Sequence, residues 1–229
     1  MSDEREHIVR SFSEDLNQLK NLILKMAGLV ENQLQLSLNS IIEHSSKDCN
    51  KIIKGDNAID KLHIEVQNSV ERIITLRQPI SLDLRNVLAA MQIAKELERV
   101  GDLAVNSARR ALIITQHAKI ENLYDLDEYF TTTKNVLREA LDAYVKNDLE
   151  LARQVWNKDD LIDELYAKLF KQLLDQMNND KKIAVPAIHL SFALKNIERI
   201  GDHATNIAED ISFILTADRN MHMSEHKKD

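Results

Sequence analysis

A pattern that occurs twice, 100 residues apart, restricts the fold of this chain more than any other feature. Residues 95–106 read KELERVGDLAVN, and residues 195–206 read KNIERIGDHATN. A weaker pair, DNAID at 56–60 and DDLID at 159–163, precedes them in the same order at an offset of 103. Motifs that recur in the same order indicate one supersecondary unit used twice. We therefore expect two similar halves.

Each half is expected to be helical. The chain has only 4 Gly and 2 Pro, so it offers few places where a helix must end. Apolar residues recur at helical spacing and predict six helices: from near Phe12 to Ile41, Ile52 to Leu76, Leu84 to Gln116, Leu123 to Lys146, from a turn at 147–148 to Met177, and, after a loop at 178–180, Ile188 to Ile214. Short connections favour antiparallel neighbours. The predicted fold is all-α, with two tandem pseudo-symmetric three-helix bundles at 1–117 and 118–217 and a flexible polar tail at 218–229.

Composition narrows the possible partners and the compartment. Acidic residues outnumber basic ones 37 to 30, which argues against a nucleic-acid-binding face and suits a cation or a basic partner. Cys49 is the only cysteine, so we expect a reducing compartment and no internal disulfide. Residues 1–10 do not resemble a signal peptide, and no apolar run reaches the ~18 residues that a membrane span needs. A cytoplasmic protein without direct membrane insertion is expected.

Carboxylates spaced four apart define the candidate site in each half. Residues four apart share one face of a helix, so four acidic pairs are each expected to line one face: Asp56 with Asp60, Glu98 with Asp102, Asp159 with Asp163, and Glu198 with Asp202. If neighbouring helices turn these faces toward one another, four carboxylates converge in each half. Clusters of oxygen ligands suit hard cations such as magnesium or manganese, and also iron. The identity of the ion is left open and includes zinc.

Two glycines favour a specific site over a solvated acidic face. Gly101 and Gly201 lie inside the repeated motif, where Gly costs a helix about 1 kcal/mol relative to Ala. That cost suggests a close backbone approach or room for a ligand. The alternative is a metal-free helical scaffold, whose acidic faces are neutralised by four ion pairs at i, i+3: Lys95–Glu98, Arg99–Asp102, Lys195–Glu198 and Arg199–Asp202.

Catalytic patterns are scarce, so we expect no enzyme. The chain has no Walker loop, no Gly-x-Ser-x-Gly and no Cys–His arrangement. The Glu-x-x-His spacing of di-iron bundles occurs at Glu4–His7 and not in the core helices. His63 could join a site, while His203 is expected on a different face from Asp202. A dinuclear metal-dependent hydrolase or oxidase remains the less favoured alternative.

The motifs together resemble the PhoU family. The resemblance rests on LERVGDLAVN and IERIGDHATN, on DNAID and DDLID, on RQPISLDLR at 77–85, and on His7 and Phe12 ahead of a long first helix. It implies two similar three-helix bundles that bind metal ions through Asp56, Asp60, Glu98 and Asp102 in one half and Asp159, Asp163, Glu198 and Asp202 in the other. Asn106, Asn206 and Asp210 are possible extensions of these motifs, and Arg99, Gly101, Arg199 and Gly201 support them.

The same resemblance implies a regulatory role in phosphate homeostasis. PhoU family members act with a phosphate ABC transporter and a membrane sensor histidine kinase, restrain phosphate uptake, repress the phosphate-starvation response and are commonly homodimers. One departure concerns partner contacts. The second half reads NNDKKIAVPAIHL where the first reads RQPISLDLR. This leaves open whether the two halves contact partners equivalently.

Overall fold

The computed structural model describes the backbone of residues 2–218 and the side chains of residues 11–218. Its helices are α1 (Ser2–Ile42), α2 (Cys49–Arg77), α3 (Ser81–Ile114), α4 (Leu126–Lys146), α5 (Leu149–Asn157), α6 (Asp159–Asn179) and α7 (Ala184–Thr216), with a short 3₁₀ turn, η1 (Lys181–Ile183), before α7. The predicted all-α fold is confirmed, and no strand occurs within residues 2–218. None of the described helices is long and apolar enough to cross a membrane.

Two differences from the predicted helices are larger than shifts of a few residues. The first helix begins at Ser2 instead of near Phe12, since residues 2–11 contain neither Gly nor Pro to prevent helix formation. The fifth predicted helix is divided into α5 and α6 at Lys158. Lys158 Nζ contacts both carboxylate oxygens of Glu139 on α4, at 2.6 and 2.8 Å. This interruption places Asp159 at the first position of α6.

The predicted turns are closed by residues in left-handed backbone conformations. Gln78, with φ 48°, ends α2 just before Pro79, which cannot donate a helical hydrogen bond. Asn147, with φ 53°, ends α4, and the Asp148 side chain then accepts a hydrogen bond from the backbone N–H of Leu151 at the start of α5. The turn expected at 147–148 is therefore present.

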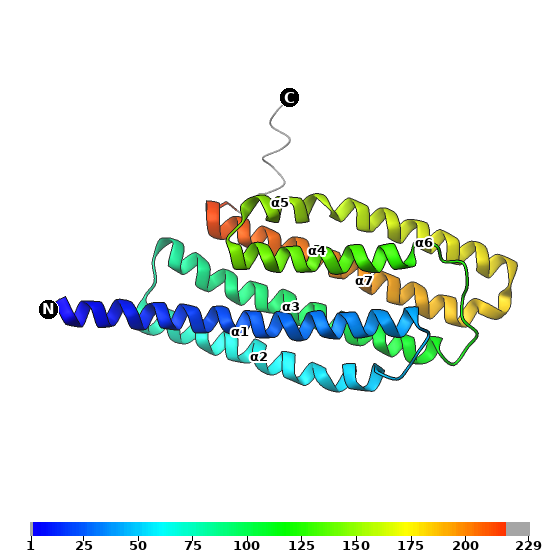
Figure 1. The fold of residues 1–229 in the computed structure, drawn as a ribbon, viewed down its shortest axis with the longest axis horizontal. Helices are drawn as coiled ribbons and strands as arrows, with labels where there is room; N and C mark the ends of the chain where they lie inside the picture. Colours follow the sequence, from blue (N-terminus) through cyan, green and yellow to red (C-terminus); the bar gives the residue numbers. More distant parts are fainter. Residues whose placement is uncertain (1, 219–229) are drawn as a thin grey trace, which may run out of the picture.

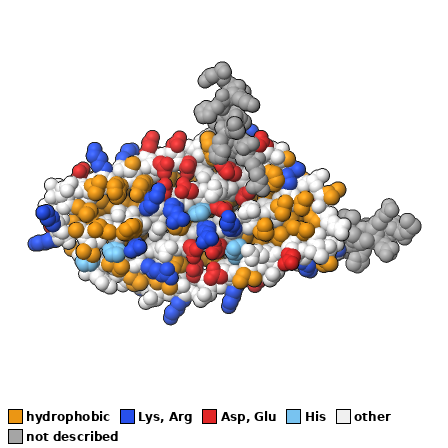
Figure 2. Space-filling model, turned by 180° about the vertical axis from the view of Figure 1, so that it is seen from behind, with side chains coloured by type: hydrophobic (Ala, Val, Ile, Leu, Met, Phe, Trp, Pro, Cys, Tyr) orange, Lys and Arg blue, Asp and Glu red, His pale blue; other side chains and the backbone are white. Residues whose placement is uncertain are grey.

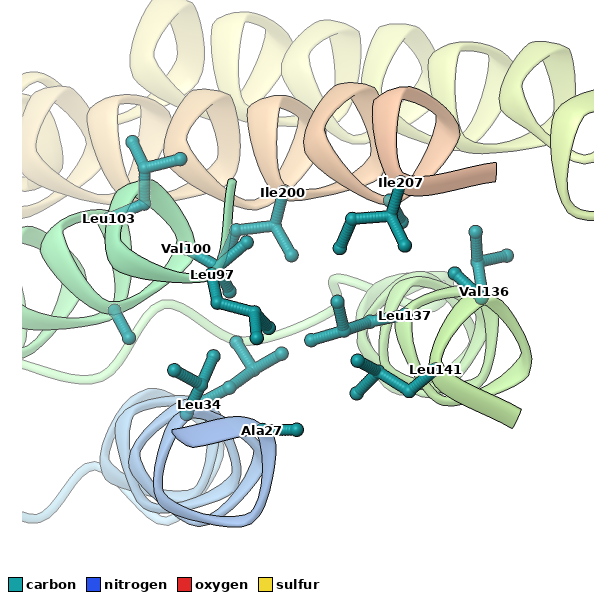
Figure 3. Close-up of a cluster of buried hydrophobic side chains, with 14 of the residues drawn as sticks. Ala27, Leu34, Leu97, Val100, Leu103, Val136, Leu137, Leu141, Ile200 and Ile207 are labelled. Carbon is teal, nitrogen blue, oxygen red and sulfur yellow. The ribbon is translucent and has the colours of Figure 1, made fainter. Parts of the chain in front are cut away.

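The two three-helix units lie side by side, with α3 of the first against α7 of the second (Figure 1). Their apolar faces meet in one continuous hydrophobic core. The close-up in Figure 3 shows side chains from four helices pointing into this core, including Leu34 from α1, Leu97 from α3, Leu137 from α4 and Ile200 from α7. Since both halves contribute to one core, α3 and α7 are fixed relative to each other.

Polar contacts also join the halves. Glu96 on α3 is buried, and its Oε2 lies 2.7 Å from Nδ1 of His203 and accepts a hydrogen bond from Asn206 Nδ2 at 3.0 Å. Near the start of α3, Arg85 Nε donates to the backbone oxygen of Ile214 at 3.0 Å. His203 therefore contacts α3 through Glu96. The division of domains at 117/118 stays a prediction, and the predicted tail lies almost entirely outside the described residues.

Candidate functional site: two acidic clusters

Gly101 brings α2 close to α3 in the first half. A methyl group at Gly101 would lie 3.2 Å from Ile59 Cδ1 and 3.5 Å from Asp56 Oδ1. Ile59 is fully buried, so its side chain is packed against the glycine. The missing side chain at Gly101 thus leaves room for the side chains of Ile59 and Asp56 from α2 beside α3.

Asp56 stands at the centre of the first cluster. Burial raises the pKa of its carboxyl, the hydrogen bond from Gln33 Nε2 at 3.3 Å lowers it, and the charges of Asp60 and Asp102 raise it further. Gln33 lies on α1 and also donates to the backbone oxygen of Ile52. The α2 and α3 carboxylates are therefore near enough to repel one another.

Glu98 belongs to the same cluster. Burial raises the pKa of its carboxyl and so does the charge of Asp102, while Arg99 and His63 oppose the shift. The Arg99 guanidinium lies 3.5 Å from a carboxylate oxygen of Glu98 and 3.5 Å from one of Asp102. His63, a weak candidate on sequence grounds, is thus close enough to influence this cluster.

The second half repeats the arrangement at Gly201. A methyl group there would lie 2.8 Å from Ile162 Cδ1 and 3.8 Å from Asp159 Oδ1. Burial, followed by the charges of Asp202 and Asp163, raises the pKa of Asp159 to about 6. The shift is upward although Asp159 begins a helix, where the positive end of the helix dipole favours a charged carboxylate. Burial and repulsion together outweigh the dipole.

Glu198 is the most buried carboxylate of the second cluster. Its side chain is 11% exposed, and Lys195 Nζ lies 2.6 Å from its Oε2. The contact is an ion pair by distance, but Oε2 accepts no hydrogen bond of good geometry from the described residues. Two of the four predicted ion pairs, Lys195–Glu198 and Arg99–Asp102, are present among the described residues.

A cavity of about 540 Å³ opens beside the second cluster. Asp159 and Asp202 line it together with Thr205, Asn206 and Trp156, the single tryptophan of the chain. Trp156 was not predicted, because the sequence does not show that the chain turns between α5 and α6 and places its ring beside Asp159. Acidic side chains gather near the middle of the face that α3 and α7 form, with Lys, Arg and His side chains among them (Figure 2).

Within each half, the charges of the predicted carboxylates influence one another's pKa values: those of Asp56, Asp60, Glu98 and Asp102 in the first half, and those of Asp159, Asp163, Glu198 and Asp202 in the second. Within residues 11–218, however, no three Asp, Glu, His or Cys side chains are arranged to bind one ion. Their role as metal ligands stays a prediction. The possible motif extensions differ: Asn206 donates to Glu96 across the halves, Asn106 accepts from Arg109 at 3.2 Å, and Asp210 is buried on α7.

Comparison with known proteins decides the family. The PhoU domain matches residues 23–111 and 126–211, one segment in each half. The chain belongs to the PhoU family. A phosphate-specific transport system accessory protein PhoU homolog from Caulobacter vibrioides is 38% identical over 214 residues, which are 93% of this chain and 93% of that protein. The homolog from Zymomonas mobilis is 40% identical over 215 residues, covering 94% of this chain and 91% of the other.

Solved structures of PhoU proteins share the fold. The crystal structure of PhoU from Pseudomonas aeruginosa superposes with a TM-score of 0.87 at 29% identity, and the match covers 90% of this chain and all of that one. The phosphate transport system regulatory protein PhoU from Streptococcus pneumoniae gives 0.82 at 24% identity, over 90% of this chain and 98% of the other. The predicted resemblance to the PhoU family is therefore confirmed across nearly the whole chain.

Proposed function

We propose that this protein is an accessory regulator of a phosphate-specific transport system, acting as a cytoplasmic protein adaptor without catalytic activity. One observation carries the proposal. Relatives with 38% and 40% identity over more than nine-tenths of this chain are named as accessory proteins of that system. The proposed partners are the phosphate ABC transporter and a membrane sensor histidine kinase. The regulator would restrain uptake and repress the starvation response when phosphate is ample.

The molecule would act through its helical surfaces. No described helix can span a membrane, so contact with a membrane system would pass through partner proteins. The acidic surface gives no broad basic face for nucleic acid. A homodimer is proposed by analogy with the family.

We also propose that the two acidic clusters hold cations. The donor chemistry fits a hard divalent ion or iron, because each cluster offers four carboxylates on two helices. The ligands would be Asp56, Asp60, Glu98 and Asp102 in one half, and Asp159, Asp163, Glu198 and Asp202 in the other. A bound ion would supply positive charge that replaces carboxylate repulsion with attraction and fastens α2 to α3 and α6 to α7.

The regulatory proposal can be tested in the native organism. Deleting the gene in phosphate-replete medium should raise phosphate uptake and expression of starvation genes, and the intact gene should restore both to the wild-type level. Uptake is measured with ³²P-phosphate and expression with a reporter fused to a starvation promoter. If neither changes in the deletion strain, the proposed function is wrong.

Trp156 provides a separate test of the second metal site. Mn²⁺ added to the metal-free protein should quench its fluorescence, since the indole lines the same cavity as Asp202. Asp202→Asn should weaken this response by about tenfold in Mn²⁺ concentration, while the matched Asp102→Asn in the first half should leave it unchanged. An identical titration for wild type and Asp202→Asn would reject the second site.

A further inference from the structure

The hairpin of α6 and α7 carries an apolar face that no part of the described chain covers. Five large side chains there are between 37% and 51% exposed: Phe170, Leu174, Val185, Ile188 and Phe192. Phe170 stacks on Tyr166 with ring centroids 6.0 Å apart, and Lys195 Nζ lies 5.3 Å from the Tyr166 ring. The Lys195–Tyr166 contact joins α7 to α6, and the two helices run antiparallel in Figure 1. We call these five residues the hairpin face.

The internal repeat shows that the fold does not require this apolar character. With the offsets of 103 for α6 and 100 for α7, the first half holds Gln67, Glu71 and Gln92 where the second holds Phe170, Leu174 and Phe192. Arg85 and Leu88 correspond to Val185 and Ile188. The same unit is therefore built with polar residues at three of these positions and with a charged residue at a fourth. Exposed apolar clusters that folding does not need mark interaction sites.

Basic groups border the hairpin face. The guanidinium carbon of Arg110, at the end of α3, lies 4.7 Å from the Phe192 ring centroid. Arg110 Nη1 lies 3.3 Å from Nδ1 of His189, and burial together with the charge of Arg110 lowers the pKa of that imidazole. Lys195, three residues after Phe192 on α7, lies near the Tyr166 ring and is paired with Glu198. This border suits a partner that presents carboxylates beside apolar side chains.

We propose that the hairpin face docks an amphipathic segment of a protein of the phosphate transport system, with apolar side chains against Phe170 and Phe192 and carboxylates toward Arg110. The inference rests on the proposed function and specifies which surface makes the contact. A second copy of this chain is a poorer match because it presents the same basic border.

The test uses residues that the first half already tolerates. Phe170→Gln, Leu174→Glu and Phe192→Gln together convert the hairpin face to its first-half counterpart. Binding of the full chain to the purified phosphate ABC transporter in lipid nanodiscs is measured by biolayer interferometry. The triple variant should bind at least about tenfold more weakly than wild type. The control, Ile64→Gln with Leu82→Gln, removes two exposed apolar residues of the first half and should bind like wild type.

Charge provides a second readout. Arg110→Glu should weaken binding by more than Arg110→Gln does, because it places a negative charge opposite the partner's carboxylates. Thermal unfolding of every variant by circular dichroism separates loss of binding from loss of fold. Equal sensitivity to the Glu and Gln substitutions would contradict an acidic partner.

The outcomes distinguish this inference from the proposed function. If wild type does not bind the transporter, both fall. If wild type and the triple variant bind equally, the hairpin face is rejected while the function stands. Two further results would overturn the inference by assigning the hairpin face to another occupant. In the first, wild type binds vesicles of phosphatidylglycerol alone and the triple variant does not. In the second, sedimentation velocity shows that wild type is a dimer and that the triple variant is a monomer.

Discussion

Asp159→Asn should stabilise the metal-free protein at neutral pH, which is unusual for the removal of a half-buried charge. The raised pKa of Asp159, about 6 against an ordinary 3.8, means that the folded state disfavours its charged form. Two pKa units correspond to about 3 kcal/mol. Partial exposure to solvent reduces this to about 1–2 kcal/mol. The lost attraction to the N-terminus of α6 opposes the gain by about 0.5 kcal/mol, so the net gain should be about 1 kcal/mol.

The pH dependence provides the sharper test. A carboxyl whose pKa is higher in the folded state holds its proton more tightly there than in the unfolded chain. The free energy of unfolding of wild type therefore falls as pH rises from about 4 to about 6, and it stays lower above that window. Asn has no such titration, so the advantage of the variant should be absent near pH 4 and complete by pH 7.5.

Urea unfolding in EDTA, followed by circular dichroism from pH 4 to pH 8, measures this difference. Glu164→Gln is the matched control, because Glu164 is an exposed carboxylate on the same helix, and its effect should stay within about 0.5 kcal/mol. The reasoning would be refuted if Asp159→Asn were no more stable than wild type at pH 7.5, or if its advantage were the same at pH 4.

Two further predictions concern the glycines and the contact between the halves. Gly28→Ala, with no atom within 4 Å of its added methyl group, should raise the free energy of unfolding by about 0.5–1 kcal/mol. Gly201→Ala should show no such gain, because its methyl group would lie 2.8 Å from Ile162 Cδ1. If urea titrations gave the two alanine variants equal gains in the free energy of unfolding, the close contact at Gly201 would be disproved. Glu96→Ala should cost about 1–3 kcal/mol, because the half-buried His203 loses its partner. Burial alone would raise the pKa of Glu96, but hydrogen bonds from His203 and Asn206 lower it below its ordinary value. The stability lost in Glu96→Ala should therefore shrink below about pH 4.5, where the carboxylate of wild type becomes protonated. A loss of stability that does not depend on pH would argue against the contact.

The repeat was sufficient to predict the helical fold, and the acidic residues it contains lie near enough within each half to shift one another's pKa values. Asp56 recurs at an offset of 103, and Glu98 and Gly101 recur at an offset of 100, so the same helix faces are marked in both copies. The helix boundaries were harder to predict. Lys158, where the fifth predicted helix is interrupted, contacts Glu139 on another helix, and neither residue interrupts a helical pattern by its own propensity.

Contacts between helices that are distant in sequence could not be predicted. Gln33 reaches Asp56 only because α1 takes one of many possible rotations against α2, and the apolar pattern of α1 does not select among them. Similarly, Asn206 repeats Asn106 in the motif, yet it donates to Glu96 of the other half. The repeat makes the two halves look equivalent, whereas the packing of α3 against α7 places different residues opposite each copy.

Metal stoichiometry tests the central claim most directly. The full chain, purified without a metal-chelating step, is dialysed against Mn²⁺ and then measured by elemental analysis. Wild type should retain metal in both clusters. The double variant Asp60→Asn, Glu98→Gln should lose the Mn²⁺ bound by the first half. The double variant Asp163→Asn, Glu198→Gln should lose the Mn²⁺ bound by the second half. If the variant with all four substitutions retained as much Mn²⁺ as wild type, the acidic clusters would not be the metal sites of this protein.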